Sequence, residues 1–188
     1  MAEIKTLIVK VPDISEQNGK GSQEAIRRGA YFENYSPGEV LINAEANQAK
    51  VVSDPRAALE SLAAGEALIE VELRGPDHES ELYDLLDKSD RRTVVAIISN
   101  RGLVFHGLGV KPKYRSAIGV SFKDVLPTLA QVGEFCLAET VEGQVLFDAL
   151  KNKNHKQGQI ERLKAALERL EKILKRENRE PWDKHDCA

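Results

Sequence analysis

The chain has 188 residues and a mass of 20.9 kDa, which suits one compact domain with an appendage or two small domains. Hydrophobic residues make up 41% and charged residues 30%, which excludes a disordered chain, and 5% aromatic residues leave little for stacking on single-stranded nucleic acid. Residues 1–150 carry 16 Lys and Arg against 23 Asp and Glu, a net charge of −7, whereas residues 151–188 carry 11 against 7, a net charge of +4. An acidic body with a basic C-terminal segment argues against a protein that wraps nucleic acid with its whole surface.

Several features favour a cytoplasmic protein. The longest aliphatic run, Val94 to Ile98, is too short to cross a bilayer, and no sustained apolar region follows Met1. Two cysteines, Cys136 and Cys187, do not suffice for a disulfide framework. We therefore expect a cytoplasmic protein with free thiols and no membrane contact.

The first half of the chain alternates strands with helices. We expect a strand from Ile4 to Val11 and a helix over 22–28 that ends at Gly29, with further strands over 39–44 and 48–52. Next we expect a helix that is capped by Asp54 and stops at Gly65, and then a half-exposed strand over 67–73 with Glu70 and Glu72 pointing into solvent. A helix starting at Asp77 and a buried strand over 93–98 are expected to follow. This alternation favours right-handed crossovers onto one parallel sheet.

Beyond residue 98 the chain is expected to fold back, because a turn at Ser99–Gly102 precedes a second apolar run over 103–108 that includes His106. We interpret His106 as a hydrogen-bonded structural residue. The later expected elements are a strand over 117–121, a helix from Asp124 to Gly133 and a strand over 134–141. The predicted fold is α/β (or α+β): a small mixed, mainly parallel sheet flanked by helices, followed by a C-terminal amphipathic or coiled-coil helix. The predicted divisions are a globular body over 1–150, the helix over 151–180 and a flexible tail over 181–188.

The C-terminal helix carries the strongest signal in the sequence. Its apolar residues recur at spacings of 3, 4, 3 and 4, the a/d pattern of a short coiled coil. They are Ile160, Leu163, Leu167, Leu170 and Leu174. We favour self-association or capture of a protein partner through this face, and the alternative is that the helix folds back onto the chain's own sheet.

A second candidate is the basic loop from residue 111 to 115. Lys111, Lys113 and Arg115 would contact phosphates while Tyr114 stacks on a base. An ordinary solvated loop explains the same residues and is the favoured interpretation, because no nucleic-acid-binding motif accompanies them.

A third candidate is a catalytic cleft at the carboxyl ends of the parallel strands. These ends supply residues suited to acid–base work or to metal-assisted phosphoryl chemistry, namely Asp54, Asp77, His78, Glu79, Asn100 and Arg101. Helix capping and turn formation account for most of them without any chemistry. The tail places His185 and Cys187 two residues apart, but two ligands do not define a zinc site. We therefore expect no metal and no cofactor.

Together these features favour a non-catalytic interaction or assembly subunit, or an adaptor, that associates through its C-terminal helix. The alternatives are a nucleic-acid-associated accessory protein that uses the basic loop and, third, a small phosphoryl-acting or hydrolytic enzyme with its site at the strand ends.

Overall fold

The structure is a computed structural model, and it describes residues 4–38, 50–52, 54–65, 68–133, 135, 137, 141–151, 160, 163–165 and 167–171. The chain divides into two compact units, residues 1–151 and residues 152–188. In the second unit, every described residue from 160 to 171 is helical. The predicted strand over 39–44 and the predicted tail over 181–188 lie outside the described residues, and one continuous helix over 151–180 stays a prediction.

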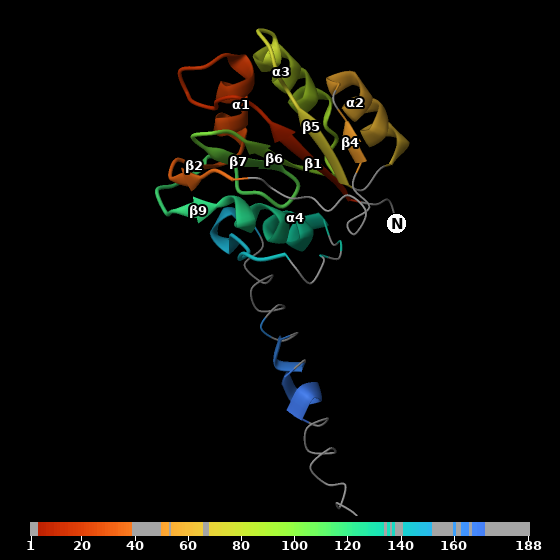
Figure 1. Ribbon diagram of the computed structural model, residues 1–188, viewed down its shortest axis with the longest axis vertical. Coiled ribbons are helices and arrows are strands. Elements are labelled where there is room, and N and C mark those ends of the chain that lie inside the picture. The colour runs from red at the N-terminus through yellow and green to blue at the C-terminus, as the bar shows by residue number, and fades with distance from the viewer. Residues whose placement is uncertain are drawn as a thin grey trace, which may run out of the picture. The chain divides into compact units, whose positions relative to one another are not determined.

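A mixed, mainly parallel sheet forms the centre of the first unit (Figure 1). Within the described residues it has seven strands in the order β4, β5, β1, β6, β7, β2, β8. Their bounds are Lys50–Val52 for β4, Leu68–Glu72 for β5, Lys5–Lys10 for β1, Thr93–Ile98 for β6, Leu103–Gly107 for β7, Ala30–Phe32 for β2 and Tyr114–Ser116 for β8. Strand β7 runs antiparallel to β6 and β2, and the other neighbouring pairs are parallel, so the remaining six strands share one direction. The predicted mainly parallel α/β fold is confirmed.

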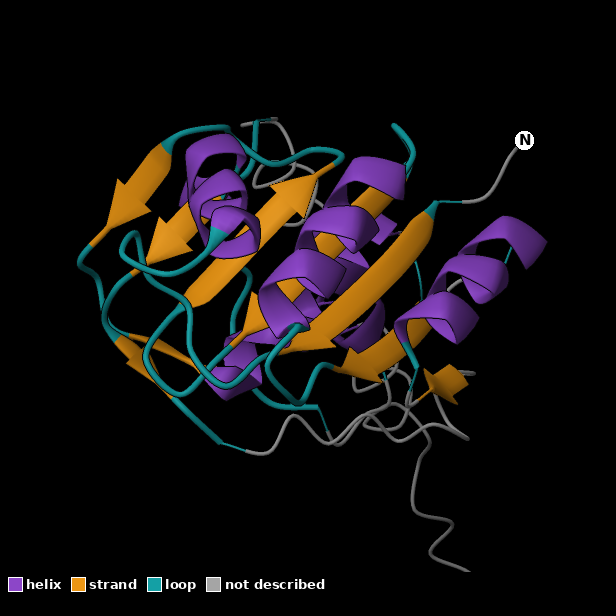
Figure 2. Ribbon diagram, turned by 90° about the horizontal axis from the view of Figure 1, so that it is seen from above, coloured by secondary structure: helices purple, strands orange, loops and turns teal. Residues whose placement is uncertain are grey.

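Helices cover both faces of this sheet. The helices α1 (Lys20–Arg28), α2 (Pro55–Ala64) and α3 (His78–Lys88) lie on one face, and Figure 2 looks onto this layer with the strands behind it. Helix α4 (Val125–Gly133) covers the opposite face. Strand β6 is buried along its whole length because alternate side chains enter the two cores, as the predicted central strand requires.

The predicted ends of α2 are confirmed, whereas one predicted cap of α3 is wrong. The Asp54 carboxylate accepts a hydrogen bond from the Arg56 backbone N–H at 2.9 Å, and the helix ends at Gly65 in the left-handed conformation with φ +89°. Asp77 occupies the position before α3, but its side chain makes no capping hydrogen bond. The acidic residues in the first turn of α3, Glu79 and Glu81, still complement the helix dipole.

Some short elements differ from expectation because they form only by pairing with strands that are distant in the sequence. Strand β8 lies in the segment that we interpreted as a basic loop, and its strand state comes from parallel pairing with β2. The predicted strand over 117–121 is reduced to β9 (Val120–Ser121), which pairs with β3 (Tyr35–Ser36). Of the predicted strand over 134–141, the described residues Phe135, Leu137 and Val141 are in irregular structure. The 3₁₀ turns η1 (Phe122–Asp124) and η2 (Phe147–Ala149) complete the described elements.

The prediction that Glu70 points into solvent is also wrong. Glu70 on β5 is buried, with 9% of its surface exposed, and its carboxylate forms an ion pair with Lys10 on the neighbouring strand β1. A buried carboxylate needs such a partner, and the alternation of charged and apolar residues along β5 does not reveal it. In the part of the chain that the structure describes, no helix has both the length and the apolar character needed to span a membrane.

Candidate functional site

The predicted apolar seam of the C-terminal helix is exposed. Ile160, Leu163, Leu167 and Leu170, which we call the apolar stripe, have 43%, 59%, 60% and 56% of their surface exposed. All four are helical, so their spacings of 3, 4 and 3 place them on one helix face. Leu174, the last residue of the predicted seam, lies outside the described residues.

This exposure is concentrated on one segment. Among the described residues, seven large hydrophobic side chains are exposed, and four of them belong to the apolar stripe. Single exposed apolar side chains are ordinary on a folded protein, whereas a contiguous row of them marks a surface that contacts another molecule. The flanking described residues, such as Lys164, Glu168 and Arg169, are exposed and polar, as the rim of such a surface would be.

The four residues of the predicted basic contact surface do not lie on one face. Lys111 Nζ donates a hydrogen bond to the Asp148 backbone oxygen at 2.7 Å and lies 5.6 Å from the centroid of the Tyr114 ring. That ring packs 5.9 Å from the ring of Phe32, against the core on the α4 side of the sheet. Tyr114 is therefore committed to packing rather than presented for stacking on a base. Because side chains alternate along a strand, Arg115 points to the opposite face, toward α1.

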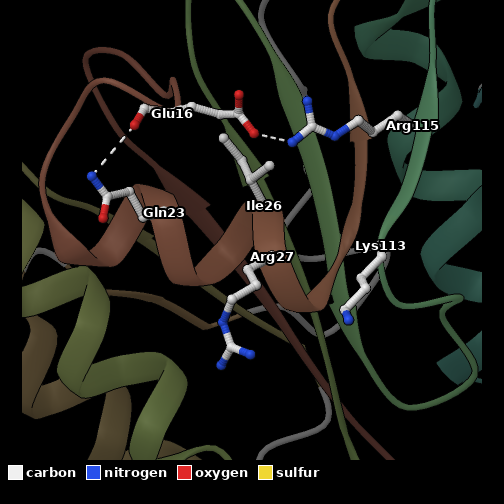
Figure 3. A pocket seen from close by; sticks show the side chains of 6 residues that line it. All are labelled: Glu16, Gln23, Ile26, Arg27, Lys113 and Arg115. Atoms are coloured by element: carbon white, nitrogen blue, oxygen red, sulfur yellow. Dashed lines mark hydrogen bonds and ion pairs between the residues drawn. The ribbon is translucent and has the colours of Figure 1, made fainter.

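Lys113 and Arg115 do lie together, in a hollow of about 370 Å³ beside α1 that we call the α1 pocket (Figure 3). One wall is the face of α1, and the other is β8 with the residue that precedes it. The loop between β1 and α1 adds a carboxylate at the rim. The lining residues are Glu16, Gln23, Ile26, Arg27, Lys113 and Arg115.

The cations of the α1 pocket differ in how they are paired. Arg115 forms an ion pair with Glu16, and the two side chains are 50% and 58% exposed. Arg27 donates from Nε and Nη2 to the two carboxylate oxygens of Glu24, each at 2.7 Å. These hydrogen bonds lower the pKa of Glu24 and raise the pKa of Arg27.

Lys113 is distinctive in its backbone conformation. Its φ of +57° lies in the left-handed region, and it is the only non-glycine residue there among the described part of the chain. This conformation costs a residue with a side chain roughly 1–2 kcal/mol. Residues held in such conformations cluster at functional sites, so this outlier makes the pocket a candidate. Lys113 also has no ion-pair partner among the described residues.

The candidate catalytic residues at the strand ends do not together line the hollow that lies there. A separate hollow of about 590 Å³ does lie beyond the carboxyl ends of β1, β5 and β6. Of the six candidate residues only Asn100 lines it, and its charged lining residues are Lys10, Glu72 and Arg74. These charges are already engaged, because Arg74 pairs with Glu72 at 2.7 Å and Lys10 pairs with Glu70 on β5.

The other candidate residues from the strand ends have structural contacts. Asp54 caps α2, and the His78 imidazole Nδ1 lies 2.8 Å from the Gly75 backbone oxygen. Arg101 is in the turn between β6 and β7, where its backbone N–H donates to Ser99 Oγ at 3.2 Å. Glu79 accepts hydrogen bonds from Ser22, at the start of α1. Within the described residues, no three His, Cys, Asp or Glu side chains gather closely enough to hold a metal ion.

Sequence reasoning missed most of the α1 pocket. It singled out Lys113 and Arg115 but not Glu16, Gln23 or Arg27, because nothing in the local sequence indicates that residues 99 positions apart will meet. The sequence gives one signal for this pocket: Ile26 and Arg27 follow Gln23 at spacings of 3 and 4, which places the three residues on one face of α1. No protein-family model and no curated protein matches the chain, so its function has to be argued from these surfaces.

Proposed function

We propose that this protein is a non-catalytic assembly subunit whose C-terminal helix pairs with the same helix of a second copy. The observation that carries the proposal is the exposure of the apolar stripe, from 43% at Ile160 to 60% at Leu167. Its spacing of 3, 4 and 3 is that of a seam which packs against one other helix rather than against a broad sheet.

Burial of the stripe is the driving force of the proposed pairing. Fully burying a leucine or isoleucine side chain contributes about 1.5–3 kcal/mol. Since about half of each side chain is still exposed, pairing contributes about 3–6 kcal/mol for the four side chains of one chain, or about 6–12 kcal/mol for two chains. Association itself costs about 4–15 kcal/mol. The two terms are of the same order, so we expect a pair whose formation depends on protein concentration.

The charges beside the stripe favour a second copy in antiparallel orientation. With Ile160 and Leu167 at heptad position a, Lys164 and Glu171 fall at consecutive e positions. In an antiparallel pair the e positions of the two helices face each other, so Lys164 of each copy meets Glu171 of the other, once on each side of the two-fold axis. In a parallel pair, the e position of one helix faces the g position of the other. The residue at position g is Ala166, which has no charge to pair with Glu171 of the other helix.

Two charged substitutions test the role of the stripe. Leu163→Asp with Leu170→Asp places carboxylates on the seam, and the expected result is loss of the paired species in light scattering with the far-UV circular dichroism of the body retained. Ala165→Asp is the matched control, because Ala165 is exposed and helical but points away from the stripe. The proposal fails if the Ala165 variant and the double variant have the same mass distribution, or if the double variant unfolds the body.

A charge exchange tests the orientation. Lys164→Glu and Glu171→Lys should each weaken the pair several-fold, because like charges then face each other across the interface. Combining them restores the opposite charges and should return the dissociation constant to within about threefold of the unmodified value. If the combined variant is as weak as the single variants, the antiparallel arrangement is wrong.

A further inference from the structure

We propose that the α1 pocket is a binding site for a small phosphorylated molecule, with Lys113 and Arg115 holding the phosphoryl group. This site is distinct from the apolar stripe and does not depend on self-association. Figure 3 shows the hollow between the α1 side chains and the two cationic side chains of the opposite wall.

The charge of the pocket is opposite to that of the body that contains it. The body carries a net charge of −7, yet the lining has three cations, Arg27, Lys113 and Arg115, and one carboxylate, Glu16. Glu24 and Arg28, which lie beside the pocket on α1 and pair with each other, add one charge of each sign and leave the excess of two positive charges unchanged. A local excess of this size inside an acidic surface attracts an anion of matching charge, and a phosphomonoester near neutral pH carries about −1.5 to −2.

The donors also suit a phosphoryl group. Lys113 offers an ammonium that forms no ion pair with any described residue, from a backbone that adopts a strained conformation at this position. Arg115 offers a planar guanidinium that can bind two oxygens at once. Gln23 holds the Glu16 loop in place, since its Nε2 donates to the Asn18 backbone oxygen at 3.0 Å. The volume of about 370 Å³ is at the small end of the range for ligand pockets.

The carboxylate of Glu16 is paired with the Arg115 guanidinium, to which the phosphoryl group of a ligand would bind. An exposed ion pair of this kind contributes about 0–1 kcal/mol, so an anion of higher charge can displace the carboxylate from Arg115. Glu16 therefore acts as an internal competitor for the ligand. This leads to an asymmetric expectation: removing a cation weakens binding, whereas removing the charge of Glu16 strengthens it.

A small molecule fits these observations better than a nucleic-acid strand does. A strand needs a row of phosphate contacts and stacking surfaces. Here the nearest aromatic side chain of the basic segment, Tyr114, is packed against Phe32 on the far face of the sheet, and Lys111 lies beside it. The pocket thus presents one cluster of cations rather than a track.

Calorimetric titration of the full-length protein with inorganic pyrophosphate tests the site directly. Lys113→Ala should raise the dissociation constant about tenfold, the loss expected for one charge-assisted contact. Glu16→Gln should lower it about threefold, because the competing charge is removed while an amide of similar shape remains. Lys88→Ala on α3 is the matched control, since Lys88 is also exposed and lies outside the pocket, and it should leave the dissociation constant unchanged.

Three outcomes would overturn the proposal. The first is equal affinity for pyrophosphate in the Lys113 and Lys88 variants. The second is weaker binding of pyrophosphate by the Glu16→Gln variant, which would mean that Glu16 helps to bind the ligand rather than competing with it. The third is a single-stranded oligonucleotide that binds more tightly than pyrophosphate and loses affinity steeply with salt, which would identify the site as a nucleic-acid contact. None of these results depends on whether the protein pairs through its stripe.

Discussion

Glu79 joins the start of α3 to the start of α1, and its removal should destabilise the body strongly. Its two carboxylate oxygens accept hydrogen bonds from the Ser22 backbone N–H at 2.8 Å and from Ser22 Oγ at 2.5 Å. Gly19, the residue before α1, makes no side-chain cap, and Ser22 is fully buried, so both donors lose their partner in a Glu79→Ala variant. Hydrogen bonds to a charged acceptor contribute about 1.5–3 kcal/mol, and we expect a loss of about 2–4 kcal/mol in the free energy of unfolding.

Urea denaturation followed by circular dichroism measures this loss. We expect the midpoint to fall while the dependence of the unfolding free energy on urea is unchanged, because the same surface is exposed on unfolding. Glu81→Ala is the control, since it also removes a carboxylate from the first turn of α3 and should cost only about 0.3–1 kcal/mol through the helix dipole. Equal midpoints for the two variants would refute the conclusion that Glu79 caps α1.

Further predictions concern a close contact, a cap and a buried histidine. Gly21→Ala should destabilise the protein by about 1–3 kcal/mol in the same denaturation assay, because the added Cβ would lie 2.4 Å from the Glu79 backbone oxygen; a neutral effect would contradict the packing of α1 on α3. Asp54→Ala should cost about 1 kcal/mol through loss of the α2 cap, and Asp54→Asn should recover most of it. Burial lowers the pKa of His106 below its ordinary value of 6.5. The positive charge of Arg28 lowers this pKa further, and the negative charge of Glu24 opposes the shift. The unfolded chain therefore binds the proton more readily, so stability should fall as the pH drops below about 6.5, and His106→Leu should make that fall less steep. An unchanged pH profile in the leucine variant would show that another group is responsible.

Local signals were sufficient for the order of strands and helices from β4 to β6 and for both ends of α2. Asp54 and Gly65 mark the two ends of α2 through a hydrogen bond and a backbone conformation that depend on neighbouring residues only. The apolar run of β6 is uninterrupted because both faces are covered, which is a direct consequence of its central place in the sheet. Such elements can be derived from the chain alone.

Elements and contacts that depend on distant partners could not be derived in this way. Strand β8 is only three residues long and rich in polar groups, so pairing with β2 determines its state. The buried carboxylate of Glu70 depends on Lys10 from another strand, and the carboxylate of Glu79 on Ser22, 57 residues away. His106 was expected to be hydrogen-bonded, but its buried Nδ1 has no hydrogen-bond partner among the described residues.

The candidate sites show the same division between local and distant information. The apolar stripe followed from periodicity, since residues 3 and 4 apart on a helix share a face whatever surrounds it. The α1 pocket did not, because Arg27 and Arg115 belong to different elements and only the folded sheet brings them together. Tyr114 and Arg115 of the basic segment point to opposite faces of the sheet, because side chains alternate along a strand.

Sedimentation equilibrium of the unmodified full-length protein, run over a hundredfold range of concentration, tests the proposed assembly most directly. We predict a mass that rises with concentration toward twice the chain mass of 20.9 kDa, as the exposed leucines of one copy are covered by those of another. A mass that stays at 20.9 kDa at every concentration would contradict it.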